Sequence, residues 1–305
     1  MQLGQYPQPG HVVAHVSDTH LLAANARQYG VVDPEAGLRL ALDRLTRVDP
    51  VPQALVFTGD LADRAEPAAY ARLRELVEPV AESLGAITVW VMGNHDERQP
   101  FAQSLFAEDG DAAQDRVHDV DGLRVVALDT TVPGYHHGDL TEDQLAWLAD
   151  VLATPAPHGT LLAMHHPPLP IPMMPAAEII ELADQHLLAE VVSGTDVRGI
   201  LGGHFHYSTY STFAGVPVSV AAATCYTSDP APLRRFVSAV DAHQAITMMH
   251  LYEDRVVHTI VPVTEAPEVS GYPSDVRAQV EALSVEERRE LLSRKDSPFY
   301  GGGEI

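Results

Sequence analysis

The chain has 305 residues, of which 46% are hydrophobic and 20% are charged, and this composition excludes a disordered or fibrous protein. The formal net charge of -23 argues against binding to a nucleic-acid polymer, because such binding needs Lys and Arg to displace counterions from phosphates. No apolar run has the length of a membrane span, and no secretory signal is visible. Since Cys225 is the single cysteine, we expect a cytoplasmic protein.

Short apolar, β-branched runs stop at polar clusters along the first two-thirds of the chain, as is typical of buried strands. We expect these strands to end before Asp18, Gly59, Gly93, Asp129, His165 and Gly202. Between them, apolar residues at helical spacing predict helices over 34–48, 67–84 and 178–192, and one that begins at Thr141. Strands that alternate with helices predict an α/β protein in which helices cover a sheet.

The C-terminal part of the chain has a different pattern. Segments 215–223, 245–252 and 255–263 have strand-like composition, and we expect them to form a second sheet that faces the first, with a hairpin turn at Glu253 and Asp254. Residues 265–274 have the composition of a linker. A charged helix over 276–294 and a flexible tail, GGGEI, are expected to follow it.

Polar side chains capable of binding metal follow the predicted strands, where open α/β sheets bind their ligands. These residues are Asp18, His20, Asp60, Asn94, His95, His165, His204 and His206. Residues i and i+2 of an extended segment point the same way, so the first two and the last two are each expected to converge. Carboxylate, amide and imidazole donors without a thiolate suit Mn, Fe or Zn ions.

Each of these motifs has an ordinary alternative when it is taken alone. D-x-H is usually a loop or a helix cap, and G-D and G-N-H-D favour turns. Their ordered succession at strand ends favours a metal site. Asp63 could be a helix-start carboxylate, His136 and His137 could face a substrate or lie in a solvated loop, and loop 167–175 could wall a cleft, contact another subunit or pack at the surface.

The strings SDTHL, VFTGDLAD, WVMGNHD, HHPP and GHFHYST together resemble the calcineurin-like metallophosphoesterase superfamily, and most closely its bacterial class III cyclic-nucleotide phosphodiesterases. The resemblance covers residues 12–207. It implies a four-layer αββα sandwich with a dinuclear metal site at the carboxyl ends of the strands. On this basis we expect a catalytic domain over 1–265, and a linker, helix and flexible tail over 266–305.

The resemblance also implies roles for individual residues. The first metal ion would be held by Asp18, His20 and His206, the second by Asn94, His165 and His204, and both by a bridging Asp60. The substrate would contact Asn94, His95 and His206. His95 would stabilise charge or protonate the leaving group, with Asp63 orienting it. The ions would be two divalent or mixed-valence metals, Fe and/or Mn, with Zn as an alternative.

The activity that the resemblance implies is hydrolysis of 3',5'-cyclic nucleotides, cAMP above all, and of 2',3'-cyclic nucleotides to nucleoside monophosphates, by a hydroxide that bridges the metals. Another phosphodiester, such as a glycerophosphodiester or a nucleotide-lipid pyrophosphate, is an alternative substrate. A non-catalytic scaffold is disfavoured because no ligand is missing. The expected partner is a small phosphodiester, and members of the family are often dimers, so a homodimer is expected.

Overall fold

The computed structural model of the chain describes residues 4–232, 234–272 and 274–297. The chain divides into two compact units. The larger unit is Pro9–Thr264, and the smaller one groups the described parts of Met1–Gln8 and Glu265–Ile305. The assignment of a catalytic domain to residues 1–265 stays a prediction.

The first sheet of the larger unit has five strands in the order β13-β12-β1-β2-β3. Their bounds are β1 His11–Val16, β2 Ala54–Thr58, β3 Ile87–Val91, β12 Ala245–Leu251 and β13 Val256–Pro262. Strand β2 runs parallel to β1 and β3, whereas β12 is antiparallel to β1 and β13. The carboxyl ends of β1, β2 and β3 therefore meet at one edge of the sheet.

The second sheet has six strands in the order β4-β5-β6-β7-β9-β8. Their bounds are β4 Arg116–Val120, β5 Leu123–Ala127, β6 Thr160–Ala163, β7 Val197–Gly202, β8 Thr209–Phe213 and β9 Val216–Val220. The four central strands are parallel, and the edge strands β4 and β8 are antiparallel to their neighbours. A separate two-stranded ribbon pairs β10 Thr227–Ser228 with β11 Ala239–Val240.

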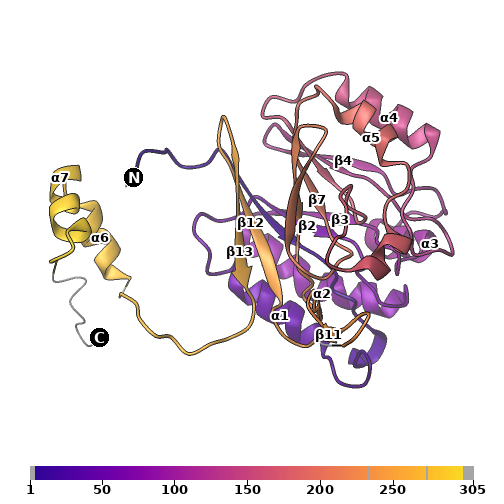
Figure 1. Ribbon diagram of the computed structural model, residues 1–305, viewed down its shortest axis with the longest axis horizontal. Helices are drawn as coiled ribbons and strands as arrows, with labels where there is room; N and C mark the ends of the chain where they lie inside the picture. Colours follow the sequence, from indigo (N-terminus) through magenta and orange to yellow (C-terminus); the bar gives the residue numbers. More distant parts are fainter. Residues whose placement is uncertain (1–3, 233, 273, 298–305) are drawn as a thin grey trace. The chain divides into compact units, whose positions relative to one another are not determined.

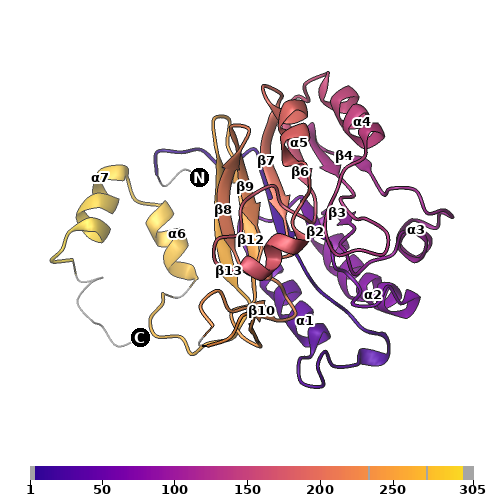
Figure 2. The same ribbon diagram turned by 45° about the vertical axis from the view of Figure 1, so that its right-hand side comes forward.

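Helices cover the outer face of each sheet (Figures 1 and 2). The first sheet carries α1 Pro34–Leu45, α2 Pro67–Leu84 and α3 Arg98–Phe106, and the second carries α4 Glu142–Leu152 and α5 Gln185–Val192. One apolar core lies between the first sheet and its helices, one between the second sheet and its helices, and a third between the two sheets. The predicted four-layer αββα sandwich is confirmed.

Local chemistry sets the limits of several helices. The Asp33 side chain accepts a hydrogen bond from the Ala36 amide at 3.0 Å and caps α1, and Pro34 suits its first turn. Helix α2 ends at Gly85, whose φ of 67° is left-handed, a conformation that glycine adopts without steric cost. Thr141 and Gln144 form a reciprocal capping box at the start of α4.

The C-terminal strands do not form a sheet of their own, so that expectation is wrong. Segment 215–223 supplies β9 to the second sheet, whereas β12 and β13 extend the first. Strand β12 is apolar on both faces: Ile246 and Met248 pack beneath the helices, while Met249 and Leu251 lie between the sheets. A strand with two apolar faces is stable only where both are covered. The predicted hairpin between β12 and β13 is present.

The helix predicted over 178–192 is interrupted. The 3-10 helix η2, Pro175–Ile180, comes first, and α5 begins only at Gln185. Between them the backbone is extended, because Gly138 donates to the Glu181 carbonyl and accepts from the Ala183 amide. The 3-10 helix η1 Ala23–Asn25, α3, β4 and β8 are further elements that the patterns did not predict.

In the smaller unit, the helix predicted over 276–294 is also broken. It consists of α6 Asp275–Glu281, α7 Val285–Arg288 and a π-helical turn at Arg289–Ser293. Ser284 starts α7 as an N-cap that accepts a hydrogen bond from the Glu287 amide, which separates the two helices. The expected tail at 301–305 lies outside the described residues. Among the residues described, no helix has the length and apolarity to cross a membrane.

Candidate metal centre and active site

The predicted site residues gather at the carboxyl ends of the strands, between the two sheets. Asp60 stands at the middle of the group. Its Oδ2 lies 3.3 Å from His20 Nε2 and 3.4 Å from His165 Nε2. A single carboxylate oxygen thus faces both halves of the candidate ligand set, as a bridging ligand must.

Most candidate ligands lie just beyond the strands in a left-handed backbone conformation. Positive φ angles are found at Asp18, His20, Asp60, His204 and His206. This conformation is unfavourable for residues with a Cβ and is concentrated at functional sites. The expectation that alternation along an extended segment aligns i with i+2 is therefore wrong. The side chains converge because the backbone turns sharply at each of these positions.

Two glycines allow the loops to come close enough for this convergence. A Cβ on Gly203 would lie 2.0 Å from Ser17 Oγ and 2.8 Å from Asp18 Oδ2. A Cβ on Gly93 would lie 2.1 Å from the Asp60 amide nitrogen. Neither position has room for a side chain, so glycine is required by the close approach of neighbouring atoms rather than by chain flexibility.

The first half of the candidate centre is formed by Asp18, His20, Asp60 and His206, which offer ligand atoms within 4.8 Å of one another. All four are buried. His20 Nε2 lies 3.2 Å from His206 Nε2, and His206 Nε2 lies 3.3 Å from Asp18 Oδ1. Such an arrangement of oxygen and nitrogen donors around one point is typical of a transition-metal site.

The second half is centred on His165. Its Nε2 lies 3.0 Å from Asn94 Oδ1, 3.2 Å from His204 Nδ1 and 3.4 Å from Asp60 Oδ2. His166 also lies close, but its two nitrogens have other partners, Thr130 Oγ1 at 2.8 Å and the His136 carbonyl at 3.1 Å. His166 therefore has no nitrogen left for a metal ion.

The four candidate histidines share one hydrogen-bonding arrangement. Each has one ring nitrogen towards the centre and the other within hydrogen-bond distance of an oxygen. The outer contacts are His20 Nδ1 with Asp63 Oδ1 at 3.0 Å, His206 Nδ1 with the Tyr226 carbonyl at 3.0 Å, His165 Nδ1 with the Thr58 carbonyl at 2.8 Å, and His204 Nε2 with the Ile180 carbonyl at 2.9 Å. An outer N–H that donates to oxygen leaves the inner nitrogen with a lone pair. The donor set therefore fits metal ions.

The electrostatics of the site favour cations. Burial opposes a charge on His20, but Asp60 and Asp63 outweigh it and raise the pKa of His20 to about 10. Burial is likewise outweighed at His165, whose pKa Asp60 raises to about 9. Burial, with a contribution from His165, lowers the pKa of His204 to about 3. The buried carboxylates thus attract positive charge strongly, and metal ions compete with protons for it.

His95 is placed by Asp60 and Asp63. Its amide donates to Asp60 Oδ1 at 2.8 Å, and its Nδ1 lies 3.0 Å from the Asp63 main-chain carbonyl. The Asp63 carboxylate is 3.9 Å from the same nitrogen and instead bonds His20. The role of Asp63 in orienting His95 stays a prediction: its carbonyl contacts the ring directly, while its carboxylate bonds His20 and lies near His95.

Asp96, the last residue of G-N-H-D, is a structural member of the site that the sequence patterns did not single out. Its buried carboxylate accepts hydrogen bonds from the amides of Leu61, Ala62 and Gly93 and from the hydroxyl of Tyr70, at 2.8–3.1 Å. Asp96 therefore joins the loop after β2, which carries Asp60, to the loop after β3. The sequence feature that could have indicated a role for Asp96 is its position directly after Asn94 and His95.

A cavity of about 370 Å³ opens onto the candidate centre. Its polar lining residues include His20, Asp60, Asn94, His95, His136, His204 and His206. Apolar groups also line it, among them Met174, Ala177, Ile180, Val237 and the ring of Tyr226. Loop 167–175 and η2 thus contribute to the wall of the cleft. A small molecule with a charged end and an apolar body would suit this mixed lining.

A four-layer sandwich that brings two buried carboxylates, an amide and four imidazoles to its strand ends has the features of a dinuclear metal-dependent hydrolase. The comparison with known proteins agrees. The profile of the calcineurin-like phosphoesterase family matches residues 11–208, and the chain belongs to this family. Its members use a dinuclear metal site.

Two relatives are similar over nearly their full length. The cAMP/cGMP dual specificity phosphodiesterase MT0825 of Mycobacterium tuberculosis is 49% identical over 280 residues, which cover 92% of this chain and 88% of the relative. A probable cyclic nucleotide phosphodiesterase of Rhodococcus erythropolis is 46% identical over 292 residues, 95% of this chain and 96% of the relative. The crystal structure of a dimetal phosphatase from Danio rerio has a TM-score of 0.61 at 18% identity, over 85% of this chain and 98% of its own. That likeness supports the fold.

Proposed function

We propose that the chain hydrolyses 3',5'-cyclic nucleotides, cAMP and cGMP, to nucleoside 5'-monophosphates, and that it accepts 2',3'-cyclic nucleotides as well. The observation that carries the proposal is the cavity at the candidate centre, whose lining combines the imidazoles and carboxylate of the centre with apolar side chains, so that it would suit both a phosphate and a nucleoside. The similarity to a relative named as a cAMP/cGMP phosphodiesterase supports this substrate class.

In this proposal two metal ions occupy the centre, with Fe and/or Mn preferred and Zn as an alternative. The first ion would be held by Asp18, His20 and His206, the second by Asn94, His165 and His204, and Asp60 would contribute to both. Bound ions of this kind activate water and neutralise phosphate oxygens. Formation of a homodimer and a cytoplasmic location stay predictions.

The protein's own groups then bind the substrate and handle its protons. Asn94, His95 and His206 lie on the cavity surface, where they would contact the phosphate. When water attacks phosphorus it releases a proton to the solvent, and the P–O3' bond breaks, so that the departing O3' needs a proton. His95 as an imidazolium, with Nδ1 held by the Asp63 carbonyl at 3.0 Å, would donate that proton from Nε2.

A panel of phosphodiesters tests the substrate class. The purified, metal-replete protein is assayed with cAMP, cGMP, 2',3'-cAMP, a glycerophosphodiester and a nucleotide-lipid pyrophosphate, at equal concentrations. We expect the cyclic nucleotides to give the largest kcat/KM. Cleavage of a glycerophosphodiester or a pyrophosphate, with cyclic nucleotides left intact, would show that the proposed substrate class is wrong.

The metal assignment has a separate test. Asn94→Ala removes a proposed ligand, and we expect it to lose at least about 10-fold in affinity for one of two ions and to lose hydrolysis of a generic phosphodiester. His186→Ala, a change at an exposed histidine of α5, is the matched control and should behave as the parent protein. Two ions bound with parental affinity in Asn94→Ala would contradict the assignment.

A further inference from the structure

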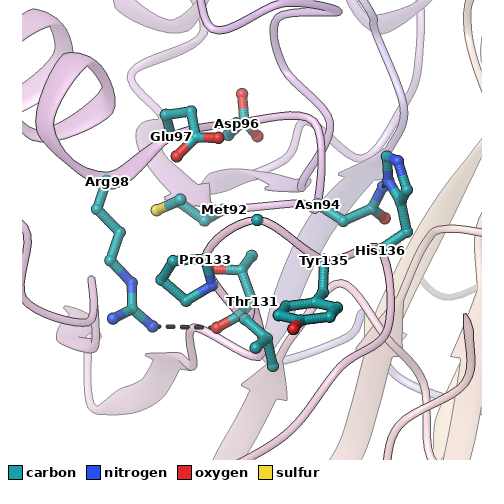
Figure 3. A pocket seen from close by; sticks show the side chains of 11 residues that line it. Met92, Asn94, Asp96, Glu97, Arg98, Thr131, Pro133, Tyr135 and His136 are labelled. Atoms are coloured by element: carbon teal, nitrogen blue, oxygen red, sulfur yellow. Dashed lines mark hydrogen bonds between the residues drawn. The ribbon is translucent and has the colours of Figure 1, made fainter.

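The side chain of Asn94 has a hydrogen-bond partner at each end of its amide. Its Oδ1 lies 3.0 Å from His165 Nε2, within the candidate centre, and its Nδ2 lies 2.9 Å from His136 Nδ1, on the opposite side. Figure 3 shows the Asn94 side chain beside the ring of His136. Of the two ends, only the oxygen can bind a cation, since the NH₂ group has no free lone pair to offer.

An amide can rotate by half a turn and exchange these two ends, so a metal-binding asparagine needs a group that selects one orientation. His136 Nδ1, as an acceptor, bonds the Asn94 NH₂ group and would repel its oxygen. With the NH₂ group held at His136, the oxygen faces His165 and Asp60. The contact from His136 therefore favours the orientation in which Asn94 can act as a ligand.

The main chain of His136 is itself held in place by His166, which lies beside the candidate centre. Its carbonyl lies 3.1 Å from His166 Nε2, and His166 Nδ1 lies 2.8 Å from Thr130 Oγ1. A bridge between Thr131 and Gly138 closes the base of this loop, and a Cβ on Gly138 would lie 2.5 Å from the ring of His166. Although His136 is exposed, its main chain is thus fixed by a fully buried side chain.

These contacts form a closed chain of interactions around the second half of the centre. Asn94 is hydrogen-bonded to His136, and His136 is hydrogen-bonded to His166. His165, the sequence neighbour of His166, is hydrogen-bonded to Asn94 and completes the ring. The pair of Asn94 and His136 also separates the main cavity from a neighbouring pocket of about 210 Å³, because both residues line each of them. Loop 131–138 is therefore a built part of the site.

We propose that His136 is a positioning residue, which holds the Asn94 amide with Oδ1 towards the second metal ion. The inference rests on the proposed function, in which Asn94 is a ligand. His136 acts through Asn94, in the manner of groups that orient metal ligands from behind and whose loss typically weakens metal affinity by about 10- to 100-fold. Loss of His136 should therefore weaken metal binding directly, and should lower turnover only as a consequence of that weaker binding.

The test compares three variants of the full chain after metal has been removed. Mn²⁺ is titrated into each protein by calorimetry, and hydrolysis of a generic phosphodiester is measured against Mn²⁺ concentration. His136→Leu keeps the bulk of the side chain and removes the acceptor. His136→Asn can place an oxygen near the position of Nδ1. His137→Leu makes the same apolar change one residue further along the loop, where the side chain contacts Tyr135.

For His136→Leu we expect about 10-fold weaker binding of one Mn²⁺ ion and a matching rise in the Mn²⁺ concentration that gives half-maximal activity. His136→Asn should recover most of the lost affinity, and His137→Leu should match the parent. Parental Mn²⁺ affinity in His136→Leu, or equal loss in all three variants, would overturn the inference.

The outcome for Asn94→Ala separates this inference from the proposal beneath it. If Asn94→Ala binds two ions with parental affinity, the ligand assignment itself is wrong. If Asn94→Ala loses affinity while His136→Leu does not, the ligand assignment stands and only the role of His136 is refuted.

Discussion

Replacing Asp96 with asparagine tests whether one buried carboxylate holds two catalytic loops together. Its Oδ2 accepts from the amides of Leu61 and Gly93, and its Oδ1 accepts from the amide of Ala62 and the hydroxyl of Tyr70. In Asp96→Asn an NH₂ group replaces one of these oxygens. Towards Leu61 and Gly93 it would meet two backbone donors, whereas on the other side the Tyr70 hydroxyl can turn and accept from it.

The new amide is therefore expected to point its NH₂ group towards Tyr70 and to leave the Ala62 amide without an acceptor. One buried donor without a partner costs about 1–3 kcal/mol, and the bonds that remain lose the added strength of a charged acceptor. We expect Asp96→Asn to lower the free energy of unfolding by about 2–4 kcal/mol. Tyr70→Phe removes one donor and keeps both oxygens bonded to amides, so about 1 kcal/mol is expected.

Urea unfolding followed by circular dichroism measures both losses, and hydrolysis of a generic phosphodiester measures the effect on the site. Asp96 joins the loops that carry Asp60 and Asn94, and a shift of about 1 Å in such positions can cost about 100-fold in rate. The loss of activity in Asp96→Asn should therefore exceed that in Tyr70→Phe. The reasoning is refuted if the two variants are equally stable and equally active.

Three further predictions concern the same unit. Gly203→Ala should abolish activity and lower the melting temperature, because its Cβ would meet Ser17 Oγ at 2.0 Å; parental melting would contradict the contact. The hydrogen bond from Arg72 outweighs burial and lowers the pKa of Glu35 to about 2, so its stabilisation is present above pH 4.5 or so and is lost as the pH falls through about 2. Since Arg72 is 38% exposed, Glu35→Gln should cost no more than about 1 kcal/mol at pH 7 by urea unfolding, and a difference from the parent that does not shrink near pH 2 would refute the linkage. Removal of metal by a chelator should lower the melting temperature by mass action, and Mn²⁺ should restore it; an unchanged melting temperature would argue against bound metal.

The membership of the candidate centre could be predicted because each residue is marked locally. Every one of them follows an apolar strand, and the glycines beside them, such as Gly59 and Gly93, indicate tight turns. The number of strands and their division between two sheets were harder to predict from the sequence. Strand β12 is apolar on both faces, and its pairing with β1 joins segments separated by more than half the chain, so no local pattern indicates it.

The backbone conformation at the centre could not be predicted from the same patterns. Asp18 has a φ of 50° and His204 a φ of 71°, both unfavourable in isolation. These conformations persist because long-range contacts fix them: both oxygens of Asp18 accept from the His204 amide at 3.2 Å. The carboxylate of one loop thus stabilises the turn of another, and neither sequence segment alone contains that information.

The same reasoning explains why ligand identity is easier to predict than ligand orientation. The acceptor of the outer N–H fixes the tautomer and orientation of a metal-binding histidine, and here those acceptors come from residues far away in the chain. His206 uses the carbonyl of Tyr226 at 3.0 Å, and His204 uses the carbonyl of Ile180, in η2, at 2.9 Å. Main-chain carbonyls carry no sequence signature. The donor set can therefore be recognised by its residue types, while the tautomer that makes each imidazole a ligand is decided by the fold.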